Sequence, residues 1–430
     1  MFRFAHFFVV ELTLDCNAKC EYCYLKDRHE YAGQKMSFET FKNLIDHIIY
    51  NEKIINSGKK IIMVMHGGEP LLLGKKFTEK ILKYAYESFK EAEIDANLSF
   101  QTNGILLDDE YLDIFEKYKC TAGISFDGDE GHNHMRTPNP EVEKDIFDKI
   151  IKYKKEKRSI GVLTVVTQSN IDYIKEFKSK VEKGKELKLI PVIDTDNVIS
   201  KIEVPSKKYY DILEKDYVES LEWIDSSSEY TNTDRILKKA VTDVLFDHTE
   251  SCQSTCSFKF CGSGISILSI TPNGGVNVCD RWNLDHKDKF FLHKPNTYDF
   301  LGVKQIKKAL KFNRILHNIN IETGCDTCYA RHICGGDCQS LHYSKFGRFG
   351  IDKKRVCVST KLIYDFVSEN IDKIIDRLIL KGSYFSREEQ LLKLKFRMLV
   401  KFQERGASIN ISDDRKTVLI TKRENFNEGI

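Results

Sequence analysis

The chain has 430 residues, with 67 basic and 64 acidic side chains and a formal net charge of +3 at pH 7. This length predicts about three domains, and the even balance of charges argues against a nucleic-acid or membrane-surface partner. No apolar run is long enough to span a bilayer, and the N-terminal MFRFAHFF lacks the features of a signal peptide, so a cytoplasmic protein is expected.

From Phe7 to about Asp194, apolar strand-like runs alternate with amphipathic helical patterns six times. The predicted strands are residues 7–14, 61–66, 98–102, 122–126, 160–166 and 188–193. Between the first two, residues 37–56 have apolar side chains on one helical face, and Ser37 is the predicted N-cap. Repeated strand–helix units give parallel strands with right-handed crossovers, so the sequence predicts an α/β partial barrel of six units. Its active site is expected at the carboxyl ends of the strands.

Four regions are predicted along the chain. They are the partial barrel (1–200), a helical bridge (201–250), a cysteine-rich domain (251–360) and a helical C-terminal extension with a hairpin (361–430). The hairpin is expected because alternating apolar residues, from Ile409 to Ile411 and from Val418 to Ile420, flank a polar turn. The extension has no motif that we can assign, so packing is its expected role.

Three cysteines follow the first strand. Cys16, Cys20 and Cys23 have the spacing C-x3-C-x2-C, and Tyr22 directly precedes the last. A cubane 4Fe–4S cluster has four irons, so three thiolates leave one iron open to a small molecule. In this motif the chain resembles the radical S-adenosylmethionine (AdoMet) enzymes. The alternative is a zinc site, with His29 as a further ligand.

A glycine pair and a glutamate, in the segment 66–70, follow the second strand. Glycines allow a ligand to approach the backbone closely, and a glutamate accepts hydrogen bonds from an ammonium group. The resemblance implies that Gly67, Gly68 and Glu69 hold the methionine amino group of AdoMet.

Further polar residues follow the third and fourth strands. The cofactor-binding residues that the resemblance adds are Tyr22, Gln101, Ser125, Asp127 and Arg136. It implies that Ser125 faces the ribose and that Arg136 pairs with the methionine carboxylate. The family usually has proline where Asp129 stands, and the segment 132–136 matches its His-Asp-x-x-Arg pattern only loosely. Ordinary turn and capping chemistry is the alternative for Gln101, Ser125 and Asp127.

Nine of the thirteen cysteines lie between residues 252 and 357. Cytosolic thiols stay reduced, so this density indicates metal binding rather than disulfides. A C-x2-C-x5-C-x3-C run begins at Cys325, and Cys261, Gly274 and Cys279 fit C-x12-G-x4-C around a turn at 272–275. The pattern resembles the SPASM extension of radical AdoMet enzymes, which holds two auxiliary 4Fe–4S clusters. A zinc module is the alternative.

The SPASM resemblance implies two ligand sets. One is Cys256, Cys261, Cys279 and Cys338, and the other is Cys325, Cys328, Cys334 and Cys357. With the first cluster they account for eleven of the thirteen cysteines. Cys252 is an alternative to Cys256, and Cys120 is expected to be a small buried hydrophobic residue.

Asp280 directly follows the predicted ligand Cys279. In sulfatase-maturing members of the family a Cys-Asp pair at this point supplies a catalytic base that deprotonates the substrate side chain. The alternative role of Asp280 is to accept hydrogen bonds from backbone amides around the cluster loop.

The resemblance implies three clusters, AdoMet and a peptide maturase. Reductive cleavage of AdoMet would give a 5′-deoxyadenosyl radical that abstracts hydrogen from a ribosomally made precursor peptide. Oxidation to a thioether or carbon–carbon cross-link would follow. The alternatives are an anaerobic sulfatase-maturating enzyme, which oxidises cysteine or serine to formylglycine, and, in another class, a zinc-dependent interaction module.

The expected partners follow from this chemistry. They are the precursor peptide or protein substrate and a flavodoxin- or ferredoxin-type reductant. Because the first strand begins near Phe7, leader recognition is expected to need a separate protein or the C-terminal extension.

Overall fold

The computed structural model describes residues 5–23, 25, 33–55, 58, 60–181, 262–264 and 266–280, the strands at 187–191, 291–293, 408–411 and 418–421, and single helical positions within 208–218 and 365–377. The chain divides into two compact units. One comprises Met1–Asp211 and Gln253–Ser359, and the other comprises Ile212–Cys252 and Thr360–Ile430. The four predicted region boundaries stay a prediction.

The first unit contains a nine-stranded sheet in the order β6-β5-β4-β3-β2-β1-β7-β8-β9. Its strands are β1 (Phe7–Thr13), β2 (Ile61–Gly67), β3 (Ala96–Thr102), β4 (Cys120–Ser125), β5 (Ile160–Val166), β6 (Leu187–Pro191), β7 (Ile267–Ile270), β8 (Val276–Asn277) and β9 (Phe291–His293). Strands β1 to β6 are parallel neighbours in chain order. The predicted α/β architecture with six parallel strands is therefore confirmed.

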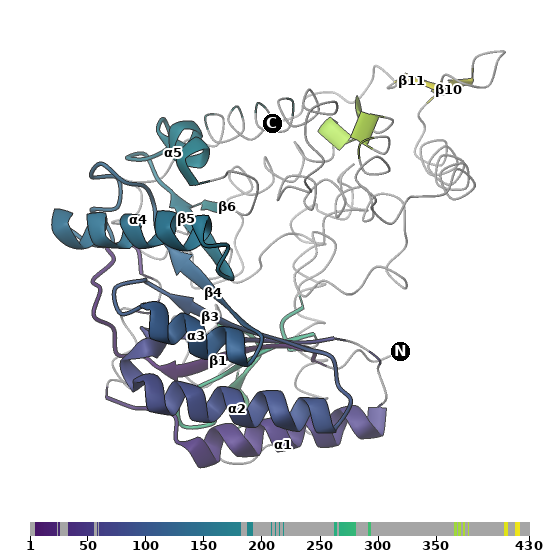
Figure 1. The fold of residues 1–430 in the computed structure, drawn as a ribbon. Helices are drawn as coiled ribbons and strands as arrows, with labels where there is room; N and C mark the ends of the chain where they lie inside the picture. The colour runs from purple at the N-terminus through teal and green to yellow at the C-terminus, as the bar shows by residue number, and fades with distance from the viewer. Residues whose placement is uncertain are drawn as a thin grey trace. The chain divides into compact units, whose positions relative to one another are not determined.

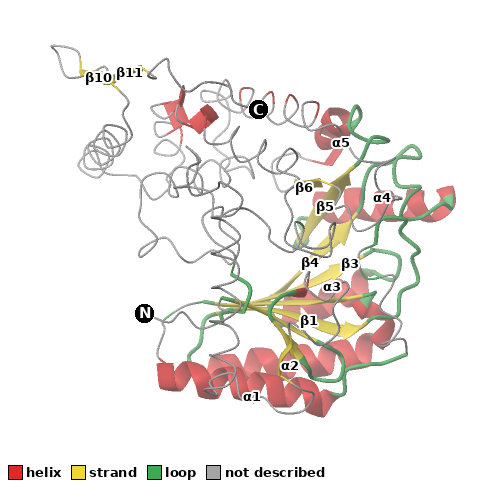
Figure 2. Ribbon diagram, turned by 180° about the vertical axis from the view of Figure 1, so that it is seen from behind, coloured by secondary structure: helices red, strands yellow, loops and turns green. Residues whose placement is uncertain are grey.

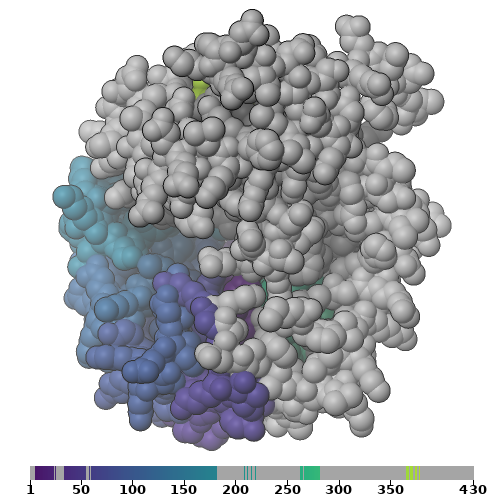
Figure 3. Space-filling model, turned by 90° about the vertical axis from the view of Figure 1, so that its right-hand side faces the viewer, coloured from purple at the N-terminus to yellow at the C-terminus, as the bar shows by residue number. Residues whose placement is uncertain are grey.

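Helices connect these strands and line one side of them (Figures 1 and 2). They are α1 (Phe38–Ile55), the 3-10 helix η2 (Pro70–Leu73), α2 (Lys75–Glu91), α3 (Asp109–Lys117), α4 (Pro140–Lys155) and α5 (Ile174–Val181). Ser37 caps α1 as predicted, because its Oγ accepts the backbone N–H of Thr40 over 3.0 Å. In the space-filling view the described surface passes from purple through blue to teal, so successive strand–helix units are neighbours in space (Figure 3).

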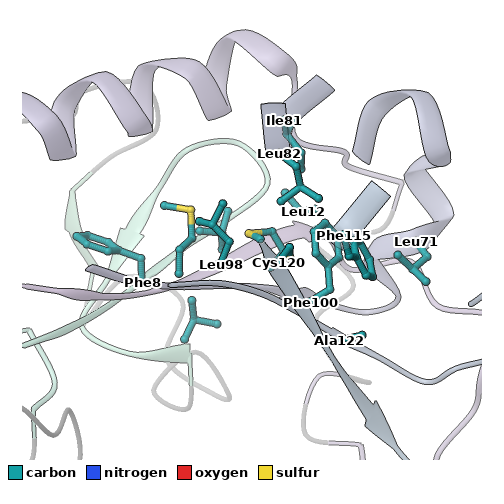
Figure 4. Packing of buried hydrophobic residues seen from close by; sticks show 14 of the residues in the cluster. Phe8, Leu12, Leu71, Ile81, Leu82, Leu98, Phe100, Phe115, Cys120 and Ala122 are labelled. Carbon is teal, nitrogen blue, oxygen red and sulfur yellow. The ribbon is translucent and has the colours of Figure 1, made fainter. Parts of the chain in front are cut away.

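The hydrophobic core lies between the sheet and the helices. Along β2, Ile61, Met63 and Met65 are buried toward the helices, and the residues between them are half-buried. Burying one such side chain contributes about 1.5–3 kcal/mol. Cys120 lies in this core beside Leu98 (Figure 4) and is 1% exposed, which confirms it as a small buried hydrophobic residue.

The sheet continues into the cysteine-rich region. Strand β7 pairs in parallel with β1, from Phe7 opposite Ile267 to Val10 opposite Ile270. Strand β8 returns antiparallel to β7 through the predicted turn, in which Gly274 has a φ of +82°. Residues far apart in the sequence thus extend the sheet beyond β1.

The second unit contains the predicted hairpin. Strands β10 (Ser408–Ile411) and β11 (Val418–Thr421) are antiparallel, with Ile409 opposite Ile420 and Ile411 opposite Val418. The hairpin prediction is therefore confirmed. Across the described parts of both units, no helix has the length and apolar character needed to cross a membrane.

Candidate metal and cofactor site

The three predicted cluster ligands lie in one loop at the carboxyl end of β1. Cys16 is exposed, and Cys20 and Cys23 are half-buried. Among the residues that the structure describes, no three histidine, cysteine or acidic side chains are grouped as ligands of a single metal ion. A cubane bonds each thiolate to a different iron, so its ligands do not need to meet at one point.

N–H groups face each of the three sulfurs. The contacts are Ala18 N to Cys16 (3.4 Å), Asn103 Nδ2 to Cys16 (3.7 Å), Leu25 N to Cys23 (3.4 Å) and Arg136 to Cys20 (4.0 Å). Partial burial raises the pKa of Cys20 in the metal-free protein, which favours the protonated thiol there. Because N–H donors stabilise the thiolate that ligates iron, the donor set fits an iron–sulfur cluster.

Gly67 and Gly68 hold the loop after β2 against the cysteine loop. Gly68 N donates to Thr13 O over 2.8 Å, and Glu69 N donates to Asp15 O over 2.8 Å. A Cβ on Gly67, whose φ is +120°, would lie 2.0 Å from Thr13 O, and one on Gly68 would lie 2.2 Å from Asp15 O. Both glycines therefore permit a close backbone contact within the protein, and their predicted contact with AdoMet stays a prediction.

We expect Gly68→Ala to destabilise the protein by about 2–4 kcal/mol, because the new methyl group overlaps backbone atoms that no rotamer change can move. Chemical denaturation measures this loss of stability. Displacement of the backbone of the cysteine loop should also lower the amount of iron that this loop binds. Gly131→Ala is the control: its φ is +86°, but a Cβ there meets nothing within 4 Å. It should cost about 1 kcal/mol. Equal losses in the two variants would contradict the packing role of Gly68.

Glu69 joins the loops after β2 and β3. Its carboxylate is fully buried and accepts hydrogen bonds from Leu71 N (3.0 Å), Thr102 Oγ1 (2.9 Å) and Asn103 N (2.7 Å). Burial raises the pKa of Glu69 to about 7, although these donors lower it. An ammonium group beside this carboxylate would favour its ionised form. The site therefore suits the amino group of a ligand.

Gln101 and Ser125 meet on the face of the sheet opposite the helices. Gln101 Nε2 donates to Ser125 Oγ over 2.8 Å. A Cβ on Gly123 would lie 2.6 Å from Gln101 Oε1, so Gly123 makes room for the amide. This places two predicted cofactor-binding residues side by side near the strand ends.

Asp127 joins Tyr22 to Arg136. The Tyr22 hydroxyl donates to Asp127 Oδ2, and Arg136 Nε lies 2.9 Å from Asp127 Oδ1. The guanidinium carbon lies 5.2 Å from the centroid of the Tyr22 ring. Burial alone would lower the pKa of Arg136, but Asp127 raises it above its ordinary value, so the guanidinium is charged. Pairing of Arg136 with a methionine carboxylate stays a prediction, since in this structure its charge is paired with Asp127.

Asp129 anchors its loop to α5 and to Tyr173, the residue before this helix. Its carboxylate accepts the Tyr173 hydroxyl and lies 3.2 Å from Lys180 Nζ. The Tyr173 ring stacks on His132, with centroids 4.1 Å apart. These contacts restrain the loop that carries Asp127 and Arg136.

Asp280 lies just after β8, beside Cys279. The Cys279 thiol donates to Asp280 Oδ1 over 3.0 Å, and Cys279 is 5% exposed. The other predicted auxiliary ligands are Cys256, Cys261, Cys325, Cys328, Cys334, Cys338 and Cys357, and these, like Cys252, lie outside the described residues. The auxiliary ligand sets therefore stay predictions.

Sequence analysis missed three residues of the site. Thr102 and Asn103 directly follow Gln101, and both donate hydrogen bonds to Glu69. Their position as polar residues at the end of a parallel strand could have identified them from the sequence. Glu11 is fully buried in β1, where its Oε1 accepts the hydroxyl of Ser269 over 3.2 Å. Glu11 could have been identified from the sequence as an acidic residue within an otherwise apolar strand.

Comparison with known proteins adds to this geometry. Residues 10–181 match the family model described as "Radical SAM superfamily". A cysteine-type anaerobic sulfatase-maturating enzyme of Clostridium perfringens is 24% identical over 388 residues, which cover 84% of this chain and 96% of the relative.

Two solved structures have a similar fold. "Native anSMEcpe with bound AdoMet and Kp18Cys peptide" has a TM-score of 0.66 at 17% identity, over 86% of this chain and 98% of that chain. Streptococcus suis SuiB bound to its precursor peptide SuiA has a TM-score of 0.55 at 13% identity, over 79% and 72%. At these identities the likeness shows the fold alone, and it confirms the predicted partial-barrel type.

Proposed function

The chain belongs to the radical SAM superfamily through its domain at residues 10–181, and we propose that it is a maturase that acts on a peptide or protein. As a radical SAM enzyme it uses a 4Fe–4S cluster and AdoMet. When bound, these groups supply one-electron cleavage of the sulfonium and hence a 5′-deoxyadenosyl radical. The observation that carries the proposal is the loop of three thiols faced by N–H donors, beside the buried Glu69.

Each group of residues in the site would bind a different part of the cluster or of AdoMet. Cys16, Cys20 and Cys23 would each ligate one iron and leave the fourth open to the amino and carboxylate groups of AdoMet. Glu69 would accept a hydrogen bond from the ammonium group, supported by its pKa of about 7. The pair of Gln101 and Ser125 would bind the ribose through hydroxyl and amide groups that already face each other.

We propose two candidate substrates, the first of which is a ribosomally made precursor peptide with a thioether or carbon–carbon cross-link as the product. A fold shared with SuiB bound to its precursor peptide supports this choice. A sulfatase substrate, oxidised to formylglycine, has equal support. It is favoured by the sulfatase-maturating relative of matching length and by the Cys279–Asp280 pair.

We further propose two auxiliary 4Fe–4S clusters, held by the two cysteine sets of the C-terminal half. With three filled cubanes, the protein should contain about twelve irons. The five cysteines that the structure describes are free thiols, which supports a cytoplasmic location, where cysteines stay reduced. A flavodoxin- or ferredoxin-type protein would be the electron donor, and a separate protein or the C-terminal extension would bind a leader sequence.

Mass spectrometry of treated peptides tests the proposed function. The anaerobic, reconstituted enzyme is incubated with dithionite, AdoMet and either a precursor peptide from a neighbouring small reading frame or a sulfatase peptide. A change mapped to a cross-linked pair supports the first substrate, and formylglycine supports the second. Stoichiometric zinc in place of iron, with no AdoMet cleavage, would instead indicate the zinc-dependent interaction module.

We expect Asp280→Asn to separate AdoMet cleavage from product formation, if Asp280 is the base for the substrate side chain. The variant should form 5′-deoxyadenosine at the wild-type rate but should make product about 100-fold more slowly. Chromatography of both products in one reaction measures the ratio. A parallel fall in both products would instead assign Asp280 to the support of the cluster loop.

A further inference from the structure

The second half of the cysteine loop packs on the segment 127–136 that follows β4. Glu21 N donates to Met135 O over 2.9 Å. Tyr22 and Met135 form a small buried apolar cluster, against which Cys20 and Val165 pack. Glu21, directly after Cys20, and Tyr22, directly before Cys23, thus depend on this segment for their position.

Asp127 is the centre of this contact and is 2% exposed. Its backbone is fixed from two sides, because its N–H donates to Asn133 Oδ1 over 3.0 Å and its C=O accepts Asn170 Nδ2 over 3.0 Å. Its Oδ1 also accepts Val165 N over 2.9 Å. The carboxylate is therefore held rigidly between β4 and β5.

Protein partners contact both oxygens of the Asp127 side chain. Val165 N and Arg136 Nε share Oδ1, and the Tyr22 hydroxyl takes Oδ2. A carboxylate has about four acceptor positions. Three of these positions are occupied by residues from the cysteine loop, the segment after β4 and strand β5, so the carboxylate connects parts of the protein to one another.

We propose that Asp127 is a positioning residue that fixes the second half of the cysteine loop before the cluster and AdoMet bind. It does so by holding the Tyr22 hydroxyl and the Arg136 guanidinium, which lie beside Cys20. The proposal rests on the proposed function, because it assigns the purpose of this order to cluster and AdoMet binding. The contact also requires the charge of Asp127, since the guanidinium of Arg136 is largely buried and is paired with this carboxylate.

Asp127→Asn in the full-length chain tests this role. Hydrogen–deuterium exchange is measured first on the cluster-free protein. Peptides that cover residues 16–23 should exchange about tenfold faster than in wild type, because the loss of a hydrogen bond to a charged group favours local opening. After anaerobic reconstitution, AdoMet should bind about tenfold more weakly. The electron paramagnetic resonance change on adding AdoMet should be smaller.

Asp129→Asn is the matched control. Asp129 is a buried aspartate two positions away in the same loop, but its partners are Tyr173 and Lys180. Asp129 does not contact the cysteine loop itself, so this variant should accelerate the exchange of residues 16–23 by a clearly smaller factor than Asp127→Asn does. Equal acceleration in both variants, or none in Asp127→Asn, overturns the proposal.

Tyr22→Phe removes only the hydroxyl that contacts Asp127, and it decides the question if Asp127→Asn fails to fold. It should accelerate exchange of the loop by a smaller factor, and unchanged exchange overturns the proposal. In a protein that already carries Tyr22→Phe, Asp127→Asn should accelerate exchange of residues 16–23 by a smaller factor than it does in wild type. Because exchange is measured without a cluster, it tests the positioning role even if no peptide is modified, whereas absence of AdoMet cleavage in wild type contradicts the proposed function.

Discussion

Replacing Cys16, Cys20 and Cys23 together with alanine should abolish 5′-deoxyadenosine formation. The loop provides every protein ligand proposed for the first cluster, so no iron would remain beside Glu69 to transfer an electron. The iron content should fall by about four atoms, from about twelve to about eight, because the auxiliary clusters would stay bound. Chromatography of the reaction products and a colorimetric iron assay measure the two effects.

Cys120→Ala is the control for loss of a cysteine as such. Cys120 is buried in the core between β4 and the helices, and burial raises the pKa of its thiol far above the ordinary value. The control should retain iron and AdoMet cleavage, at a stability cost of about 1 kcal/mol for the small cavity. Residual 5′-deoxyadenosine in the triple variant would show that other residues of the chain ligate the active cluster.

Glu69→Gln should remove a pH dependence from the stability of the cluster-free protein. Glu69 has a pKa of about 7 in the folded state, against about 4.5 in the unfolded state. The folded protein therefore binds more protons between these values, and the free energy of unfolding falls as the pH rises. From pH 5 to pH 8 the loss from this group is about 2–3 kcal/mol.

Glutamine resembles the neutral acid, so the variant should keep a flatter stability profile across this range. Urea unfolding at pH 5, 6.5 and 8 measures the difference between the two proteins. Glu79→Gln is the control, because Lys117 lowers the pKa of Glu79 and keeps this exposed carboxylate ionised throughout. Parallel profiles for wild type and Glu69→Gln would rule out the raised pKa.

The same substitution should weaken AdoMet binding to the reconstituted protein at pH 7. Glutamine offers no negative charge to the ammonium group, so the dissociation constant should rise about tenfold or more. Isothermal titration calorimetry under anaerobic conditions measures this change. An unchanged constant would assign Glu69 only to the support of η2 and the loop after β3, where it accepts three hydrogen bonds.

Local patterns in the sequence predicted most of the described fold. Apolar runs between amphipathic helical patterns located strands β1 to β6 within a few residues, and Ser37 marked the start of α1. The same reasoning located the hairpin of β10 and β11, because its signal lies within a short segment. These features are determined by residues that are close together in the chain, so a single sequence is enough to predict them.

Local sequence patterns could not predict contacts between residues that are far apart in the chain. The sequence predicted a turn at 272–275 in the cysteine-rich region, but only the folded chain shows that β7, just before this turn, pairs with β1. Tyr22 and Asp127 are 105 residues apart, and their hydrogen bond depends on how two loops meet at the end of the sheet. The role of Gly68 also follows from a backbone contact with Asp15 that no spacing rule encodes.

At residue 129, where the family resemblance implies proline, an aspartate changes what restrains the loop after β4. Proline would restrict the backbone through a covalent ring, independently of the surrounding solution. Here the restraint includes an ion pair to Lys180, whose side chain is 27% exposed and therefore partly screened by dissolved ions. The rigidity of the segment that holds Arg136 beside Cys20 should therefore depend on the salt concentration as well as on the amino-acid sequence.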